Sequence, residues 1–311
     1  MMVVSLSFII CHLSFSPVRA QTRLFVRGSA VPGGIQQLTR FSTNTSGRYT
    51  FKFHGKLLPG DLYITTTDSP KASSYYYAPK LVDTNIVTDR ADYTQKRDSV
   101  GAEWAVLFEA DNYRFTVDTY NKQVTGELFA RWYEAWICGG CVEDRQGEGI
   151  SGQEGHWQIS SGKQMEQSWD DPNVFEWTGL LKAYSYNQEP KRFKINGQYG
   201  WSPKVLHSFT QDAPILTASQ VWYNGSEDYK WAISKDGYYH IKINVFKETI
   251  EGEYLGTELP DGIDPLNEEL RMESEEFATA LGWFTIDGRR LEGKPTHKGI
   301  YIYKGKKIII K

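Results

Sequence analysis

The sequence predicts an all-β protein built from two β-sandwich modules in tandem, followed by a short C-terminal β-hairpin segment. Aromatic residues make up 14% of the 311 residues, and there are 28 glycines. Such a composition is typical of short strands separated by tight turns. Several apolar runs alternate with polar residues, as strands with one wet face do. The same succession of strand and turn signals also occurs twice along the chain.

The internal repeat divides the chain into a first module, residues 21–128, and a second module, residues 129–255. Each module is of single-domain size and contains several short strands, which indicates a sandwich. Each begins with an apolar strand that runs into a glycine break and ends with turn residues before a last strand. Five segments correspond in order: 24–31 with 135–142, 47–53 with 173–179, 60–64 with 191–195, 77–80 with 201–204, and 111–117 with 236–243.

The first 20 residues resemble a secretory signal peptide that is cleaved after Ala20. The apolar run is too short and too interrupted by polar residues to span a membrane, although the segment before it lacks Lys and Arg. Cys11 raises the alternative of a lipoprotein, but Ile9–Ile10 fits a lipid-attachment box poorly. We therefore expect an exported protein, at the outer membrane or cell surface or outside the cell.

The chain after the second module changes character. Residues 256–280 form an acidic linker, with a short helix expected over Asn267–Ala280. Residues 281–311 form a tail in which Trp283–Leu291 predicts one strand pair, and a hairpin is expected around Lys304–Gly305.

Charge and motifs exclude several classes of function. The net charge is −3 and no basic stripe is present, which argues against a nucleic-acid partner. The nucleophile-elbow and zinc-protease motifs are absent. A glycosidase needs two carboxylates that flank the scissile bond, whereas the neighbours Asp170–Asp171 and Glu227–Asp228 face opposite sides of a strand. His207 and His240 lack a partner by motif. We expect no catalytic residue, metal or cofactor.

The mature chain keeps two cysteines, Cys138 and Cys141, at C-x-x-C spacing. That spacing is compatible with a redox motif or with half of a metal site. Because no second pair follows and no βαβ pattern surrounds them, we favour an incidental or disulfide-capable pair in an exported protein.

The segment around Lys194 carries the main functional hypothesis. Phe193 and Ile195 share one parity and Lys194 has the other, so Lys194 is expected to point outward from a half-buried strand. Asn196–Gly197 then turns the chain.

Tyr199 and Trp201 follow at a strand end, and Pro203 excludes a central strand there. Lys204 comes directly after them. Rings and cations at one rim suit a sugar, whose C–H faces pack on rings while its hydroxyls accept hydrogen bonds from Lys. The alternative is that Trp201 fills the core, since most of a Trp is usually buried.

Two long loops and one turn supply further candidates. The loop over residues 143–167 carries His156 and Trp157, and long loops on a sandwich often hold binding residues. The further ring candidates are Tyr75, Tyr76 and Tyr77 in the loop over residues 69–99, and Trp222 before a turn. Trp104 and Trp231 have strand context and are expected in the cores.

The doubled unit, from Leu24 to about Leu255, resembles the SusE/SusF-type surface glycan-binding proteins of bacterial starch-utilisation systems. Trp157, Lys194 and Trp201 stand where that family carries two tryptophans and a lysine. The resemblance implies immunoglobulin-like sandwiches and a non-catalytic binding surface for a starch-like glucan or another polysaccharide, with an outer-membrane glycan-import complex as a possible partner. In the first module Ile35 and Tyr63 replace the expected Trp and Lys, so that module is a spacer or holds something else.

The tail resembles the C-terminal sorting segments of proteins exported by type IX secretion. The resemblance rests on residues 287–290, 298–302 and 305–311. It implies transport to the cell surface without a lipid anchor. The alternative is a small hairpin that packs on the second sandwich.

The sequence therefore favours weak, repeated binding of polysaccharide or oligosaccharide. Two rings and a charged donor predict micromolar to millimolar affinity per site, once association entropy is subtracted. Tethering and repetition strengthen such sites. The alternatives are an adhesive, protein-binding surface module and, less favoured, an enzyme or its accessory.

Overall fold

The computed structural model describes residues 22–42, 49–70, 74–142, 157, 159, 162–182, 191–225, 227–258, 283–285, 290–291, 293, 295–303 and 306–310. Within these ranges every regular element is a strand, except the 3-10 helix η2 (Ile215–Thr217). The prediction of an all-β sandwich protein is confirmed. The signal peptide, His156 and the helix expected over residues 267–280 lie outside the described residues.

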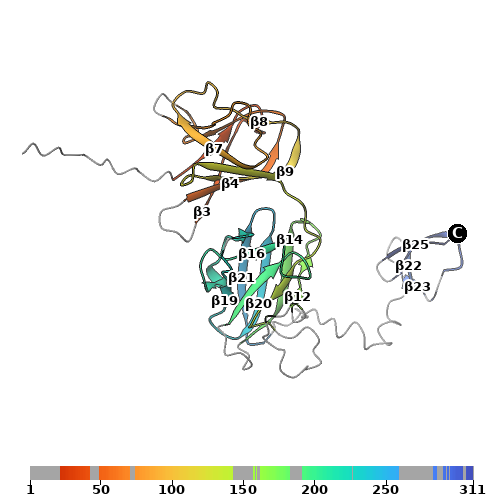
Figure 1. The fold of residues 1–311 in the computed structure, drawn as a ribbon. Coiled ribbons are helices and arrows are strands. Elements are labelled where there is room, and N and C mark those ends of the chain that lie inside the picture. The colour runs from red at the N-terminus through yellow and green to blue at the C-terminus, as the bar shows by residue number, and fades with distance from the viewer. Residues whose placement is uncertain are drawn as a thin grey trace, which may run out of the picture.

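The first module folds as one ten-stranded antiparallel sheet, in the order β2-β1-β5-β6-β7-β10-β9-β4-β3, with β8 paired to β5 (Figure 1). Its strands are β1 (Phe25–Arg27), β2 (Ile35–Gln37), β3 (Thr39–Ser42), β4 (Tyr49–Leu57), β5 (Gly60–Thr65), β6 (Tyr76–Pro79), β7 (Thr88–Lys96), β8 (Trp104–Val106), β9 (Ala110–Asp118) and β10 (Gln123–Leu128). The early part of β7 pairs with β10 and its later part pairs with β6. One strand thus connects the two layers of the sandwich.

The register of β4, β9 and β10 separates an apolar face from a polar face. Phe51 lies opposite Val117, which lies opposite Val124, and all three are buried. One residue along, Lys52 is opposite Thr116, which is opposite Thr125. Because side chains alternate along strands, this second row lies on the outer face, which is turned towards the second module.

The second module contains a seven-stranded sheet and a four-stranded sheet. The larger sheet contains β11 (Trp136–Cys138), β12 (Lys163–Gln164), β15 (Arg192–Asn196), β16 (Val205–His207), β17 (Ala213–Pro214), β18 (Trp222–Tyr223) and β19 (Trp231–Ala232). The smaller sheet has the order β13 (Glu166–Gln167), β14 (Val174–Leu181), β20 (Gly237–Asn244) and β21 (Thr249–Gly256).

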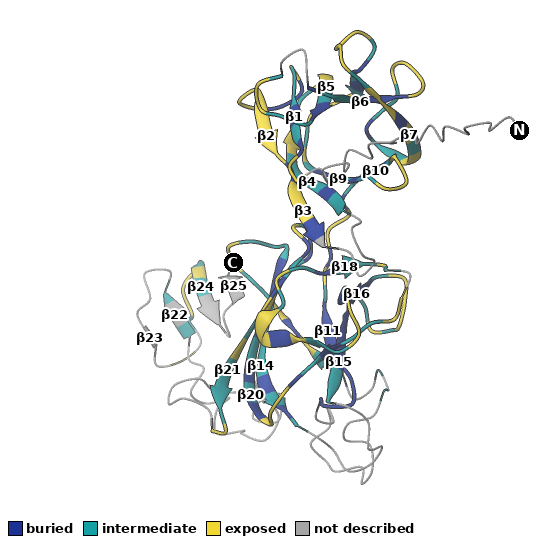
Figure 2. Ribbon diagram, turned by 90° about the vertical axis from the view of Figure 1, so that its left-hand side faces the viewer, coloured by how far each residue is buried: buried dark blue, intermediate teal, exposed yellow. Residues whose placement is uncertain are grey.

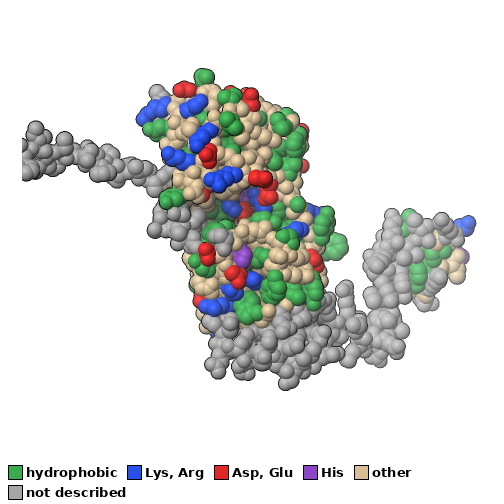
Figure 3. Space-filling view, viewed as in Figure 1, with side chains coloured by type: hydrophobic (Ala, Val, Ile, Leu, Met, Phe, Trp, Pro, Cys, Tyr) green, Lys and Arg blue, Asp and Glu red, His purple; other side chains and the backbone are tan. Residues whose placement is uncertain are grey.

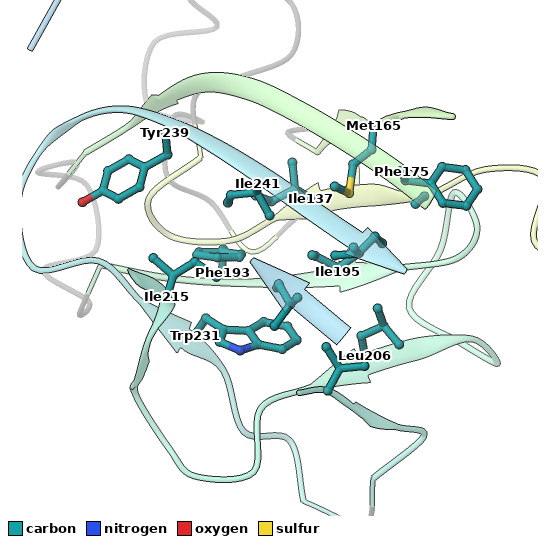
Figure 4. Close-up of a cluster of buried hydrophobic side chains, with 14 of the residues drawn as sticks. Ile137, Met165, Phe175, Phe193, Ile195, Leu206, Ile215, Trp231, Tyr239 and Ile241 are labelled. Carbon is teal, nitrogen blue, oxygen red and sulfur yellow. The ribbon is translucent and has the colours of Figure 1, made fainter. Parts of the chain in front are cut away.

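The two modules have separate hydrophobic cores. Trp104 is fully buried in the first core, where its indole N–H donates to the Tyr77 carbonyl oxygen at 2.8 Å. Trp231 is fully buried in the second core and stacks on Phe193 with the ring centroids 5.9 Å apart (Figure 4). The expectation that Trp104 and Trp231 are core residues is confirmed.

The modules lie end to end (Figure 2), and a cluster of buried charged groups joins them. Glu248, in the turn between β20 and β21, is 1% exposed. Its carboxylate accepts hydrogen bonds from Lys52 Nζ and, at 2.9 Å, pairs with His54 Nε2; both partners lie on β4 of the first module. Burial alone would raise the pKa of Glu248, but the charge of Lys52 and the contact with His54 lower it to about 2.

Arg114 on β9 strengthens the same junction. Its guanidinium pairs with Glu127 and donates to the Val245 carbonyl oxygen of the second module at 3.2 Å. The group also lies 4.5 Å from the centroid of the Tyr223 ring. Figure 3 shows acidic and basic side chains together where the modules meet.

The tail forms a four-stranded sheet in the order β23-β22-β24-β25. Its strands are β22 (Trp283–Thr285), β23 (Arg290–Leu291), β24 (Gly299–Tyr303) and β25 (Lys306–Ile310). The expected strand pair and the expected hairpin are both present, and pairing of β22 with β24 joins them. The tail is therefore larger than a single hairpin.

The buried junction predicts a large stability loss for Glu248→Ala. The change leaves Lys52 and His54 without their carboxylate, and breaking a buried ion pair costs about 3–5 kcal/mol. Urea unfolding at pH 7 measures the loss. The double variant Lys52→Met, Glu248→Leu removes both charges and is expected to recover most of the stability. Equal stability of parent and Glu248→Ala would contradict the assigned pairing.

The lowered pKa of Glu248 also predicts how the stability of the folded protein depends on pH. Because the folded pKa of Glu248 lies below its ordinary value of 4.5, its stabilisation is complete above pH 4.5 and is lost as the pH falls towards 2. Glu248→Gln should lack this component. Thermal unfolding of both proteins between pH 6 and 2 measures the difference, and parallel pH curves would argue against it.

Candidate functional site

Lys194 lies on β15, between β11 and β16 of the larger sheet. It is only 9% exposed, and the next two residues of β15 are buried as well. The expectation that Lys194 stands open to water is therefore wrong. Its ammonium group lies 4.7 Å from the centroid of the Trp201 ring and 3.1 Å from Asp228 Oδ1. Trp201 lies on a turn and Asp228 on a loop, and these two segments cover the outward face of β15. The alternation of side chains along the strand does not predict this cover.

Asp228 is the acceptor at the centre of the site. Its Oδ1 binds Lys194 and its Oδ2 accepts from Lys230 Nζ at 3.0 Å. Burial would raise the pKa of Asp228, but the hydrogen bonds from Lys230 and Lys194 outweigh burial and hold it below its usual value. The carboxylate is thus charged at neutral pH and orients two ammonium groups.

Trp157 joins this arrangement from the long loop. Lys230 Nζ lies 5.2 Å from the centroid of the Trp157 ring. Trp201 is 38% exposed, so it does not fill the core. The structure therefore brings the predicted residues Trp157, Lys194 and Trp201 together, linked through Lys230 and Asp228. We refer to these five residues as the Trp157–Trp201 surface.

His207 on β16 borders this surface. It is almost buried, its Nδ1 lies 3.6 Å from Asp228 Oδ1, and that nitrogen makes no hydrogen bond within the described part of the chain. Burial lowers the pKa of His207, against the opposing effect of Asp228. The imidazole is therefore neutral at neutral pH.

Tyr199 and Lys204 belong to the turn that presents Trp201. Tyr199 is exposed and its ring meets the edge of the Trp136 ring at 5.1 Å between centroids. The Lys204 carbonyl oxygen accepts from the Gly197 N–H at 2.8 Å, and its own N–H donates to Gln198 Oε1 at 3.0 Å. Lys204 closes the turn through its backbone, whereas Tyr199 contacts Glu134 and Trp136 outside the turn. Neither side chain takes part in the ion pairs of Asp228.

The tyrosines of the first module do not form a shared ring platform. Tyr77 is buried and stacks on Tyr93 at 4.6 Å between centroids, so it is a core residue and the candidate was wrong. Tyr75 lies under the Arg97 guanidinium, 4.7 Å from its ring centroid. Tyr76 packs against the ring of Tyr63.

Trp222 is also unsuited to stacking on a sugar. Its ring is nearly parallel to Phe209, with 5.9 Å between centroids. The backbone of Gly225 packs against the same ring, because a Cβ there would lie 2.4 Å from Trp222 Cδ2. The candidate fails because neighbouring groups already cover the ring.

The two cysteines are free and buried. Burial raises the pKa of the Cys138 thiol to about 12, partly offset by Lys194, and it also raises the pKa of Cys141. Both are therefore protonated at neutral pH, which does not suit a reactive thiol. The described residues contain no group of three or more His, Cys, Asp or Glu placed to hold a metal ion.

Sequence reasoning missed Asp228 and Lys230 as site residues. They alternate with Tyr229 directly before the buried Trp231. Because Asp228 and Lys230 are two residues apart, their side chains lie on the same side of an extended segment. This spacing of an acid and a cation is the sequence feature that could have indicated the site. The partner of each, however, lies in another part of the chain: Asp228 meets a lysine 34 residues earlier.

Comparison with known proteins adds little at this point. No family model and no curated protein matches the chain. Among solved structures, the crystal structure of SusF from Bacteroides thetaiotaomicron overlaps 79% of this chain and 50% of that chain, at 11% sequence identity and a TM-score of 0.31. The chain spans about half the length of that protein. A likeness of this size carries no functional argument.

Within the described ranges, no helix has the length and apolar character needed to cross a membrane.

The ion pairs of the site predict that Asp228→Ala destabilises the second module. Lys194 then keeps a nearly buried ammonium group without a carboxylate, while solvent screening around the exposed Asp228 limits the loss to about 1 kcal/mol. Asp236→Ala is the control, since Asp236 pairs with the more exposed Lys191 at 2.8 Å. Urea unfolding should show the larger loss for Asp228→Ala; equal losses would argue against a special role for Asp228.

Proposed function

We propose that this chain captures polysaccharide without cleaving it, through the Trp157–Trp201 surface. The observation that carries the proposal is the position of Lys194. Its ammonium group lies between the Trp201 ring and the Asp228 carboxylate, and Lys230 connects the same carboxylate to Trp157. Two rings, two donors and one acceptor thus occupy one surface.

The chemistry of this surface suits neutral sugars. The partly exposed Trp201 ring can pack against the C–H face of a pyranose, which is worth up to a few kcal/mol if counted as apolar burial. Ammonium groups donate to sugar hydroxyls, and Asp228 accepts from them. Because Asp228 already holds Lys194 and Lys230 in place, little side-chain entropy is lost on binding.

The surface also favours binding over hydrolysis. Inverting and retaining glycosidases need two carboxyl groups, one of them with a raised pKa to serve as the acid. The Trp157–Trp201 surface offers a single carboxylate, Asp228, and its pKa is lowered. The arrangement therefore supports a non-catalytic role.

The biological setting completes the proposal. The amino-terminal segment and the tail favour an exported protein at the outer membrane or cell surface. The pattern of Trp157, Lys194 and Trp201 favours a starch-like glucan, and a glycan-import complex is the proposed neighbour. Weak sites gain from tethering when they meet a long polymer.

Trp201→Ala tests the proposal. We expect the Kd for polysaccharide, measured from retardation of the protein in polysaccharide-containing native gels, to rise at least tenfold. This corresponds to a loss of about 1.4 kcal/mol of binding free energy. Trp169→Ala is a matched control, because Trp169 is fully exposed and precedes β14 in the other sheet. Unchanged retardation of a folded Trp201→Ala protein would contradict the proposal. No retardation of the parent would favour a protein-binding module, and released reducing ends would indicate an enzyme.

The pH dependence of binding is a second test. The pKa values of Asp228 and His207 both lie below their ordinary values of 3.8 and 6.5. Between pH 8 and 6.5, Asp228 therefore stays ionised and His207 stays neutral. We expect a constant Kd from pH 8 to 6.5 and a loss of affinity when Asp228 gains a proton, below pH 3.8. Calorimetric titration across this range measures it. A tenfold change in Kd between pH 8 and 6.5 would contradict the assigned charges.

A further inference from the structure

A groove of about 820 Å³ lies between the two modules and borders the Trp157–Trp201 surface, because Glu227 and Tyr229, the neighbours of Asp228, line it. This volume falls within the range of about 300–1,000 Å³ typical of small-molecule sites. One side is the polar face of the first module's sheet, and the other side is β18 and the segment after it. The groove therefore exists only because the modules are held together.

The floor of the groove is a rigid array of hydroxyl groups. Thr116 on β9 is directly opposite Thr125 on β10, and Thr50 on β4 is opposite Asp118. These side chains line the groove, while the residues that alternate with them on the same strands pack into the first core. Because the core fixes the strands, the spacing of the hydroxyl groups is set before any ligand arrives.

The wall from the second module is aromatic, and charged groups at the junction keep it in place. Tyr223 lies under the Arg114 guanidinium, 4.5 Å from its ring centroid, and Trp222 stacks on Phe209. Tyr229 and Glu227 complete this side. Since the Trp222 ring is covered, this wall offers ring edges and polar atoms and does not provide a flat stacking platform.

The charge of the lining restricts the ligand class. Five lining residues are acidic and two, Lys52 and Arg114, are basic. Both basic groups are already paired, with Glu248 and Glu127 respectively. Phosphate, nucleic acid and acidic peptides would be repelled. The described residues also hold no cluster of His, Cys, Asp or Glu fit for a metal ion.

We propose that this groove binds a segment of a neutral oligosaccharide. Carboxylates accept hydrogen bonds from sugar hydroxyls, and threonine hydroxyls both donate and accept, so a neutral polyhydroxylated ligand satisfies both kinds of group. The proposal stands on the lining of the groove, and its ligand class is the one proposed for the Trp157–Trp201 surface, which the groove meets at Glu227 and Tyr229. One chain then contacts its polymer at two adjoining places, and simultaneous binding at both raises the avidity.

Stoichiometry tests the proposal. The full chain is titrated by calorimetry with maltoheptaose, cellohexaose and laminarihexaose in turn. We expect the parent to bind two molecules of at least one of these probes. Thr125→Trp fills the groove from an exposed strand position that accepts aromatic residues, and it should bind one. Trp201→Ala should also bind one, and the combined variant none. Gln36→Trp, on the exposed edge strand β2 and outside the groove, is the control and should bind two.

A second variant separates loss of hydroxyls from added bulk. Thr116→Ala, Thr125→Ala removes two hydroxyl groups and leaves the groove open, and we expect it to weaken the Thr125-dependent site at least tenfold. A Thr125→Trp protein that binds as the parent does would overturn the proposal, as would a parent that loses all binding with Trp201→Ala. A parent that binds a single molecule, whose binding Trp201→Ala leaves unchanged and Thr125→Trp removes, would instead overturn the Trp157–Trp201 surface alone. A parent that binds none of the three probes would overturn both.

Discussion

The contact of Glu248 with Lys52 and His54 is the interaction on which the arrangement of the two modules depends. A carboxylate buried at this depth is stable only with cationic and hydrogen-bonding partners, and both come from β4 of the other module. Such a contact tolerates little displacement, because separation leaves the nearly buried charges of Glu248 and Lys52 without their partners. The modules are thus held in a defined relation, and the polar face of the first sheet becomes one side of a groove.

The Trp157–Trp201 surface follows the same physical principle on a smaller scale. Asp228 pairs with two ammonium groups and keeps them beside two indole rings. The near burial of Lys194 is compatible with a role in binding, because a shielded donor loses little entropy when it meets a hydroxyl group. The partly exposed ring of Trp201 supplies apolar area. Preorganised polar groups with modest apolar contact are what a weak, selective sugar site requires.

The sequence predicted some of these features because they depend on neighbours along the chain. Alternation and repetition gave the sandwich class, and strand context placed Trp104 and Trp231 in the cores. The errors arose where distant segments meet. Lys194 has the parity of an exposed residue, yet Asp228 and Trp201 cover it. Tyr77 was expected in a binding loop but stacks on Tyr93, and Trp222 is covered by Phe209 and Gly225. Coverage of this kind depends on tertiary packing, which periodicity does not encode.

The two modules should respond differently to mechanical tension, because β7 passes through both layers of the first module and the second module has no such strand among its described residues. Hydrogen bonds connect β6, β7 and β10 into one continuous ladder. The second module divides its strands between two sheets, and the isolated bridge of Val142 with Leu181 connects them across the described residues. Regions without continuous hydrogen bonding open most readily. Under tension we therefore expect the first module to open as one unit and the second to open first between its sheets.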